Sequence, residues 1–208
     1  MNQFVLITGW ARNEKSYEKL VNSCPPNSSI KIFPHTNLDL DNFEEKFFQF
    51  LKQNNINQIN LMGHSLGGAL AIKIANKYPE KIAKLYLVDS EGIFVKEAMS
   101  KQVLNMTLNH KSFAKRKLKE NLTSTLRILS HPKLYTKAAK FAYSADLQAE
   151  AREIKVPTII LWGENDKVTT LGQGKILNEL INNSKLVVLE GMDHDWILHD
   201  PEKFWNNI

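Results

Sequence analysis

The fold is decided by one stretch of the sequence, Ile59-Asn60-Leu61-Met62-Gly63-His64-Ser65-Leu66-Gly67-Gly68-Ala69. Its first four residues are typical of a buried strand, and a helical pattern of apolar residues runs from Leu66 to Lys77. Gly63 and Gly67 avoid side-chain clashes with the neighbouring strand and helix, so the chain can turn sharply between the two elements. The stretch therefore predicts a strand, a tight turn and a helix, with the Ser65 hydroxyl presented at the turn.

Similar apolar runs recur along the chain and predict five more strands. All are short and rich in Val, Ile and aromatic residues, as buried strands are. The six predicted strands cover residues 4–7, 30–33, 59–62, 85–88, 158–162 and 186–189. Apolar residues at three- and four-residue spacing predict helices at 16–22, 41–53, 66–77, 171–181 and 196–206. This alternation is typical of an α/β fold, a doubly wound and mainly parallel six-stranded sheet whose ligands bind beyond the carboxyl ends of the strands.

The alternation breaks in one place. Residues 91–153 contain no convincing strand, only helix-like segments at 96–108, 113–129 and 132–143. Connections in compact α/β units are usually about two to six residues long, so a segment of this size must be a substructure of its own. We therefore expect a core made of residues 1–90 and 154–208, and a helical cap, residues 91–153, inserted after the fourth strand.

Ser65 is the candidate nucleophile. It follows a predicted strand directly and precedes a helix, so the backbone N–H of Leu66 and the positive end of the helix dipole can stabilise negative charge on a reacting oxygen. A serine hydroxyl is a weak nucleophile on its own. This interpretation therefore requires a base and a group that orients the base.

Both groups are available at later strand ends. Asp166 follows the fifth predicted strand and His194 follows the sixth, which gives the chain order Ser, Asp, His. His194 would take the proton of Ser65 and return it to the leaving group, while Asp166 would hold the imidazole tautomer. Asp89 also stands at a strand end and is an alternative acid. The other imidazoles near these segments, His64 and His199, are weaker candidates for the base because one is beside the nucleophile and the other lies within a helical pattern.

A second oxyanion donor is expected in the loop after the first strand, Thr8-Gly9-Trp10-Ala11. Gly9 lets the backbone approach closely, and the backbone N–H of Trp10 is the candidate donor. The indole of Trp10 is a further candidate for lining the acyl pocket, and a tryptophan that only packs the loop is the plain alternative.

These residues resemble the α/β-hydrolase superfamily over nearly the whole chain apart from the cap. Gly63 to Gly68 resembles the nucleophile elbow of that family, Val156 to Asp166 its acid segment, and Gly191 to Glu202 its histidine segment. Many members have two strands before the first strand found here, and a His-Gly pair where this chain has Thr8-Gly9, so the resemblance implies a trimmed α/β-hydrolase fold. Within the family the chain is most similar to small serine carboxylesterases such as pimeloyl-acyl-carrier-protein methyl ester esterase.

The resemblance implies a serine hydrolase that cleaves a carboxylic ester or thioester through an acyl-enzyme on Ser65. A serine at this position excludes the aspartate nucleophile of the family's epoxide hydrolases and haloalkane dehalogenases. The alternative is a catalytically silent member that uses the same fold to bind a ligand or a partner.

The charge of the chain is concentrated in one segment. The 208 residues include 27 Lys and Arg against 22 Asp and Glu, for a net charge of +5, and the excess lies between Glu91 and Lys155. A lysine-rich segment is usually solvated surface, but it can also attract an acidic partner. Since the related esterase uses a basic cap to meet its acidic carrier, an acidic carrier protein docking on the cap is a hypothesis for this chain. Charge alone gives no reason to expect specific nucleic-acid binding.

The rest of the composition excludes several classes of protein and of binding site. An apolar content of 43% with 24% charged residues is ordinary for a globular protein, and Cys24, the single cysteine, excludes an intrachain disulfide or a CxxC site. The six histidines are scattered, no HExxH motif occurs, and Gly172-Gln173-Gly174-Lys175 lacks the Ser or Thr of a phosphate loop. We expect no metal and no cofactor. The chain has no secretory leader pattern and no apolar run of about 18 residues, so we expect a cytoplasmic protein without membrane insertion.

Overall fold

A computed structural model of the chain describes residues 2–33, 40–94 and 129–208. A six-stranded sheet in the order β2-β1-β3-β4-β5-β6 forms its centre, and every neighbouring pair of strands is parallel. The strands are β1 (Asn2–Ile7), β2 (Ser28–Phe33), β3 (Ile59–His64), β4 (Ile82–Val88), β5 (Thr158–Gly163) and β6 (Ser184–Leu189). All six predicted strands are confirmed, and most begin earlier than the apolar runs because polar residues such as Asn2 and Ser28 also pair in the ladder.

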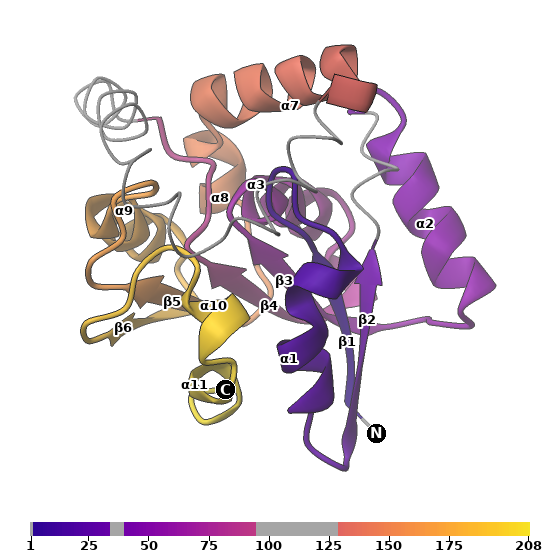
Figure 1. Ribbon diagram of the computed structural model, residues 1–208, viewed down its shortest axis with the longest axis horizontal. Helices are drawn as coiled ribbons and strands as arrows, with labels where there is room; N and C mark the ends of the chain where they lie inside the picture. The colour runs from indigo at the N-terminus through magenta and orange to yellow at the C-terminus, as the bar shows by residue number, and fades with distance from the viewer. Residues whose placement is uncertain (1, 34–39, 95–128) are drawn as a thin grey trace.

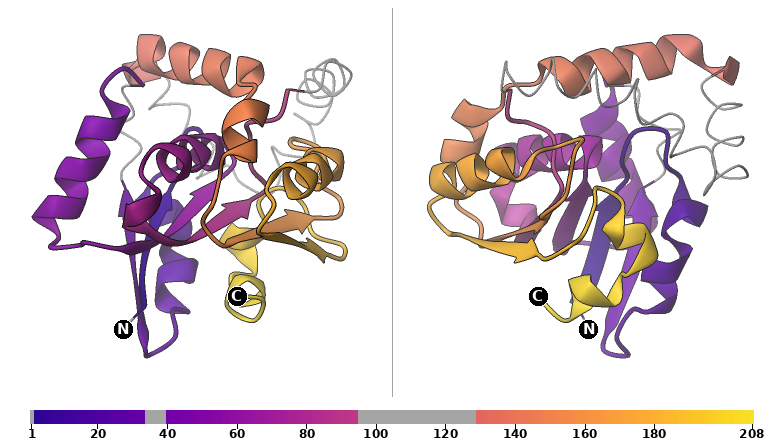
Figure 2. Two further views of the ribbon diagram at one scale, coloured as in Figure 1. Left: turned by 180° about the vertical axis from the view of Figure 1, so that it is seen from behind. Right: turned by 60° about the vertical axis from the view of Figure 1, so that its left-hand side comes forward.

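Helices pack on both faces of this sheet (Figures 1 and 2). One face is covered by α2 (Phe43–Gln53), α3 (Leu66–Lys77), α8 (Gln148–Arg152) and α9 (Leu171–Leu180), whose buried side chains share one apolar cluster. The other face is covered by a 3-10 turn (Glu14–Tyr17) that continues as α1 (Glu18–Asn22), together with α10 (Trp196–His199) and α11 (Glu202–Trp205). The doubly wound α/β architecture is therefore as predicted.

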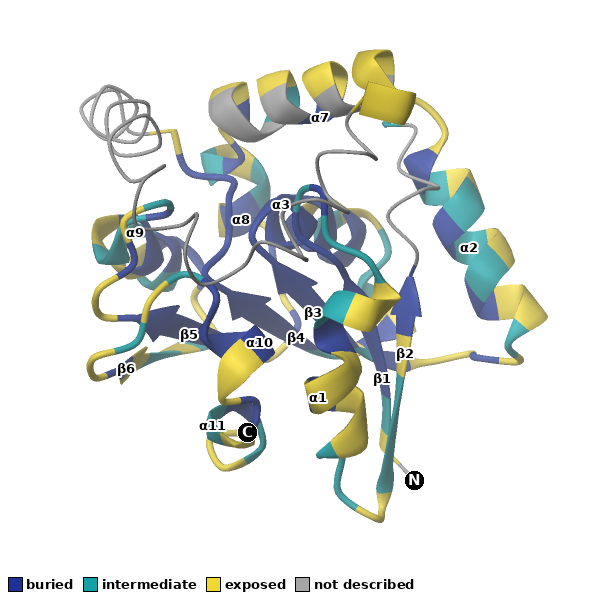
Figure 3. Cartoon of the chain, viewed as in Figure 1, coloured by how far each residue is buried: buried dark blue, intermediate teal, exposed yellow. Residues whose placement is uncertain are grey.

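The burial of each helix follows its sequence pattern (Figure 3). In α2, Phe43, Phe47 and Leu51 recur every four residues and are buried, while the opposite face is exposed. By contrast, α3 is apolar on nearly all sides, and nine of its twelve residues are buried. The helix that carries the turn residue Ser65 at its start is thus fixed in the core.

One predicted helix is wrong in its extent. The apolar spacing of residues 196–206 predicts a single helix, but the chain forms α10, breaks at Asp200, and resumes as α11. Pro201 explains the break, because it has no N–H to donate and disfavours helical backbone at the residue before it. Asp200 accordingly has φ −124° and ψ 58°.

Between β4 and β5 the described chain contains the helices α7 and α8. Helix α7 (Pro132–Ser144) confirms the helix predicted at 132–143, and it lies across the top of the molecule in all the views of Figures 1 and 2. The helix predicted at 96–108 and nearly all of that predicted at 113–129 lie outside the described residues, so a cap formed by residues 91–153 stays a prediction. In the described part of the chain, no helix is long and apolar enough to cross a membrane.

Candidate active site

Ser65 lies at the turn between β3 and α3 in a strained backbone conformation. Its φ is 55° and its ψ is −122°, a combination that L-residues rarely adopt. The turn is possible only because its neighbours are glycines, since a Cβ on Gly67 would come 2.1 Å from the carbonyl oxygen of Ile7. A Cβ on Gly63 would come 2.6 Å from the Cα of Gly68. The sharp turn predicted from the sequence is confirmed.

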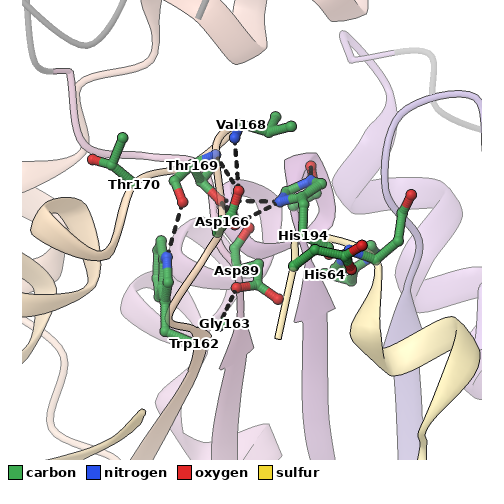
Figure 4. A network of polar contacts seen from close by, with 12 residues as sticks. His64, Asp89, Trp162, Gly163, Asp166, Val168, Thr169, Thr170 and His194 are labelled. Carbon is green, nitrogen blue, oxygen red and sulfur yellow. Dashed lines mark hydrogen bonds and ion pairs between the residues drawn. The ribbon is translucent and has the colours of Figure 1, made fainter. Parts of the chain in front are cut away.

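The side chain of His194 reaches Ser65 from the loop after β6. Its Nε2 lies 3.1 Å from Ser65 Oγ. Its Nδ1 lies 2.7 Å from Oδ2 of Asp166, in the loop after β5 (Figure 4). The three side chains come from positions 65, 166 and 194, yet they form one continuous line of hydrogen bonds. This arrangement can move a proton from a hydroxyl to an imidazole and stabilise the charged ring that results.

Asp166 is held by its own loop. Its Oδ1 accepts hydrogen bonds from the backbone N–H groups of Val168 and Thr169 at 2.7 and 3.0 Å, and its Oδ2 accepts from the Thr169 hydroxyl at 2.7 Å. Burial would raise the pKa of Asp166, but the charge of His194 and these donors outweigh burial and lower it. The carboxylate is therefore ionised and fixed in place. Sequence analysis missed Thr169, although a carboxylate followed two and three residues later by free N–H groups is a familiar turn pattern.

Asp89, the alternative acid, lies in a different position. It is fully buried after β4 at φ 42°, and its Oδ1 accepts a hydrogen bond from the N–H of Gly163 at 2.8 Å. Burial and the charge of Asp166 raise the pKa of Asp89 well above its ordinary value. Since His194 Nδ1 bonds to Asp166, the geometry favours Asp166 as the orienting acid.

Asp195 and Glu91 are two further ionisable groups that interact with the imidazole of His194. Burial would lower the pKa of His194, but Asp166 and, more weakly, Asp89 and Asp195 together raise it. Glu91, buried beside the turn, has its pKa raised to about 7 by burial, and its backbone N–H donates to the Ser65 carbonyl at 2.9 Å. No sequence pattern indicated Glu91, which follows Asp89 and Ser90 directly after β4.

The loop after β1 lies against the turn that carries Ser65. A Cβ added to Gly9 would come 3.3 Å from Ser65 Cβ, so only glycine permits this approach without displacement. The next residues form a tight turn, in which the Arg12 N–H donates to the Gly9 carbonyl at 3.2 Å and Ala11 has φ 56°. Trp10 and Leu66, the two expected oxyanion donors, thus belong to segments that meet at Ser65.

The other candidate bases lie elsewhere. His199 ends α10 and is exposed, and His64 is buried with its Nδ1 and Nε2 bonded to the Tyr17 hydroxyl and to the carbonyl of His194. Within residues 2–33, 40–94 and 129–208, no group of three or more His, Cys, Asp or Glu side chains could hold a metal ion.

Comparison with known proteins agrees with this fold. The model of a family described as alpha/beta hydrolase fold matches residues 22–125, which is half of the chain. The chain belongs to the alpha/beta hydrolase fold family.

Sequence relatives of this alpha/beta hydrolase are distant. It is 25% identical to pimeloyl-[acyl-carrier protein] methyl ester esterase of Nitrosomonas europaea over 70% of this chain and 68% of that protein. It is 22% identical to Lipase 1 of Psychrobacter immobilis, over 65% of this chain and half of the lipase. It is 24% identical to 2-hydroxy-6-oxononadienedioate/2-hydroxy-6-oxononatrienedioate hydrolase 1 of Pseudomonas putida, over 90% of this chain and 77% of that protein.

Solved structures share the fold of this alpha/beta hydrolase. A bacterial membrane phospholipase A described as a virulence factor superposes with a TM-score of 0.80 at 17% identity, over 99% of this chain and 76% of that one. The enol-lactonase of Burkholderia xenovorans LB400 superposes with a TM-score of 0.79 at 16% identity, over 99% of this chain and 88% of that one. At these identities the likeness shows the fold alone.

Proposed function

We propose that the protein is a serine hydrolase that cleaves a carboxylic ester or thioester through an acyl-enzyme on Ser65. The observation that carries this proposal is the alignment of His194, with Nε2 3.1 Å from Ser65 Oγ and Nδ1 2.7 Å from Asp166. A ligand-binding member without catalysis would not need an imidazole held between a hydroxyl and an ionised carboxylate. The names of its relatives, which include an esterase and a lipase, support the same class.

In the proposed acylation step, Ser65 Oγ attacks the carbonyl carbon of the substrate while His194 Nε2 accepts the hydroxyl proton. The carbonyl oxygen becomes an oxyanion, which accepts hydrogen bonds from the backbone N–H groups of Leu66 and Trp10. When the intermediate collapses, the bond to the leaving oxygen or sulfur breaks and His194 gives its proton to the leaving group. Asp166 stabilises the imidazolium throughout and does not itself take the proton.

Deacylation reverses these roles with water. His194 accepts a proton from a water molecule as that water attacks the acyl carbon, and the new intermediate then releases the free acid. The proton returns from His194 to Ser65 Oγ, which restores the resting site. Each step uses groups of this chain and water alone, so the proposed reaction needs no cofactor.

For the substrate we propose an ester with a small to medium acyl chain, delivered in one version of the hypothesis by an acidic carrier protein. The similarity to a carrier-protein ester esterase and the exposed lysines of α7 support this version, among them Lys133 and Lys140. Lys115, Arg116 and Lys117, three consecutive basic residues between Glu91 and Lys155, lie outside the described residues. Charge reversal at either set should lower activity on a carrier-bound ester more than on a small free ester, and equal losses would contradict docking by charge.

The proposed function is tested by labelling with a fluorophosphonate probe and by hydrolysis of a series of aryl esters and thioesters of graded acyl length. We expect labelling and turnover in the wild type and in a Ser29→Ala control, in which a serine of β2 is changed. We expect neither in Ser65→Ala. A wild-type protein that is not labelled and turns over none of these substrates would contradict the proposal.

A further inference from the structure

We propose that Tyr17 and His64 are positioning residues, which together fix the loop after β1 and the backbone of His194 relative to Ser65. The inference rests on the proposed function, because it assigns these two residues to the same site. Both side chains are buried, and neither contacts Ser65 Oγ or the carboxylate of Asp166 in the bonds described above.

The evidence is a series of three hydrogen bonds that joins the loop after β1 to the loop after β6. The N–H of Gly9 donates to the Tyr17 hydroxyl oxygen at 3.0 Å. That hydroxyl lies 2.7 Å from His64 Nδ1, and His64 Nε2 lies 3.1 Å from the backbone carbonyl of His194. This series of hydrogen bonds thus begins at Gly9, beside Trp10. It passes through His64, the residue before Ser65, and ends on the backbone of His194, the proposed base.

The donor and the acceptor at the two ends of this hydrogen-bond series determine where every hydrogen within it lies. A backbone N–H can only donate and a carbonyl can only accept, so His64 Nε2 must carry a hydrogen for the carbonyl of His194. A neutral imidazole then has a bare Nδ1, which accepts from the Tyr17 hydroxyl, while that hydroxyl's oxygen accepts from Gly9. One tautomer of His64 and one orientation of the Tyr17 hydroxyl satisfy all the groups, and no other combination does.

Burial keeps both residues neutral. It lowers the pKa of His64 to about 3, with a further contribution from the charge of His194, and it raises the pKa of Tyr17. The neighbouring ion pair of Arg12 and Asp195 acts on His64 with opposite signs and changes this little. His64 therefore stays a neutral donor and acceptor over the pH range in which a serine hydrolase works.

Contacts between aromatic rings reinforce this series of hydrogen bonds. The rings of Tyr17 and His64 pack edge to face with centroids 5.8 Å apart, and the rings of His64 and His194 lie 5.3 Å apart. Because His64 precedes Ser65 directly, the carbonyl of His194 is held against the segment that carries the nucleophile. A displacement of about 1 Å in such a site can cost on the order of a hundredfold in rate, so this restraint bears on the distance from Nε2 to Ser65 Oγ.

The test compares Tyr17→Phe, His64→Met and His64→Gln with the wild type and with Tyr86→Phe. Tyr86→Phe is the matched control. Tyr86 is a buried tyrosine of β4 that belongs to the same apolar cluster as Tyr17 but takes no part in these three hydrogen bonds. Phenylalanine keeps the ring of Tyr17 and removes only the hydroxyl. Glutamine at position 64 keeps a donor and an acceptor, whereas methionine fills the space without either.

On an aryl ester, we expect Tyr17→Phe and His64→Met each to lower kcat about tenfold while KM changes less than about twofold. The double variant should fall no further than His64→Met, because the two residues act as one unit. His64→Gln should recover part of the loss, and Tyr86→Phe should keep the wild-type kcat. Variants that lower the thermal midpoint but leave kcat unchanged would overturn the proposal, since that result would assign the pair to packing alone.

A second measurement separates this proposal from the proposed function. Nitrogen-15 NMR of the imidazole rings should show His64 neutral, with its hydrogen on Nε2, from about pH 4 to 9, and Tyr17→Phe should change its Nδ1 signal. A His64 that titrates within this range, or carries its hydrogen on Nδ1, would overturn the inference in an active protein and in an inactive one. Absence of labelling by the fluorophosphonate probe, with His64 as described, would instead contradict the serine hydrolase function.

Discussion

Asp89 and Asp166 follow neighbouring strands of the sheet, and the fold moves the pKa values of their carboxyl groups in opposite directions. Asp89 is fully buried and accepts one backbone hydrogen bond, from Gly163. Asp166 faces His194 and accepts three hydrogen bonds from Val168 and Thr169. Burial dominates at Asp89 and favours the neutral acid, whereas the partners of Asp166 favour the charged form.

Substitution of these two residues by asparagine should therefore have unequal effects. We expect Asp166→Asn to lower kcat by about 10⁴, because an amide can force the wrong tautomer on His194 and cannot stabilise its charge. Asp89→Asn should stay within a few-fold of the wild type, because asparagine keeps an oxygen for the Gly163 N–H. Steady-state kinetics on an aryl ester checks both. Equal losses in the two variants would reopen the assignment of the acid.

Asp89→Asn should also change the pH dependence of stability. The folded pKa of Asp89 lies above its unfolded value, so the folded state holds a proton that the unfolded state releases. Wild-type stability should thus fall relative to Asp89→Asn as the pH rises from about 4 toward the folded pKa. Urea unfolding at pH 4 and pH 7 measures the difference. A wild type that gains stability relative to the variant over this interval would contradict a buried neutral acid.

The activity of the proposed enzyme should rise with pH as His194 loses its proton. Asp166 raises the pKa of His194, so the pH at which kcat/KM reaches half of its maximum should lie above the ordinary histidine pKa of about 6.5. Removing the negative charge in Asp166→Asn lowers that pKa, so the residual activity should reach half its maximum at least about one pH unit lower. The measurement is kcat/KM from pH 5 to 10. A midpoint that does not move would mean that another group controls the profile.

Much of this fold and site could be predicted because it depends on local patterns. Each strand is a short apolar run, and Ser65, Asp166 and His194 each lie within five residues after such a run. The hydrogen bonds of Tyr17 and His64 could not be predicted, because they join residues that are far apart along the chain and carry no local signature. Pro201 is a sequence signal for the helix break at Asp200, but the apolar spacing continues past it and led to the prediction of a single helix.

The turn at Ser65 should tolerate no side chain at Gly67. A Cβ there would come 2.1 Å from the backbone oxygen of Ile7, which belongs to a buried strand and cannot move away. We expect Gly67→Ala to lower the free energy of unfolding by at least about 3 kcal/mol or to prevent folding. Gly172→Ala is the control, because the nearest atom, Thr170 Oγ1, would lie 3.6 Å away, so unfolding in urea should show a stability within about 1 kcal/mol of the wild type.

Arg12 and Asp195 join the loop after β1 to the loop after β6. One guanidinium nitrogen of Arg12 lies 2.8 Å from each carboxylate oxygen of Asp195, and both side chains are largely buried. Arg12→Met would leave the charge of Asp195 buried, so we expect a loss of about 3 kcal/mol in the free energy of unfolding. The double variant Arg12→Met with Asp195→Asn should recover part of that loss. Unfolding in urea measures both, and a double variant less stable than Arg12→Met would contradict a pair that acts mainly through charge.

Substitution of Trp10 by proline removes the backbone N–H that is the proposed second oxyanion donor. In the turn from Gly9 to Arg12, Ala11 occupies the position with positive φ, and proline is favoured at the position before it in a type II turn. Trp10→Pro should therefore fold, while it lacks the proposed oxyanion donor. We expect kcat to fall about a hundredfold with the thermal midpoint within a few degrees of the wild type.

Trp10→Phe separates the backbone from the indole in this experiment. Phenylalanine keeps the N–H and an aromatic ring, so we expect kcat within a few-fold of the wild type, and any change in preference among acyl chains would report on the indole alone. If Trp10→Pro and Trp10→Phe lose activity equally, the indole rather than the N–H is what the site needs, and the second oxyanion donor must be sought elsewhere.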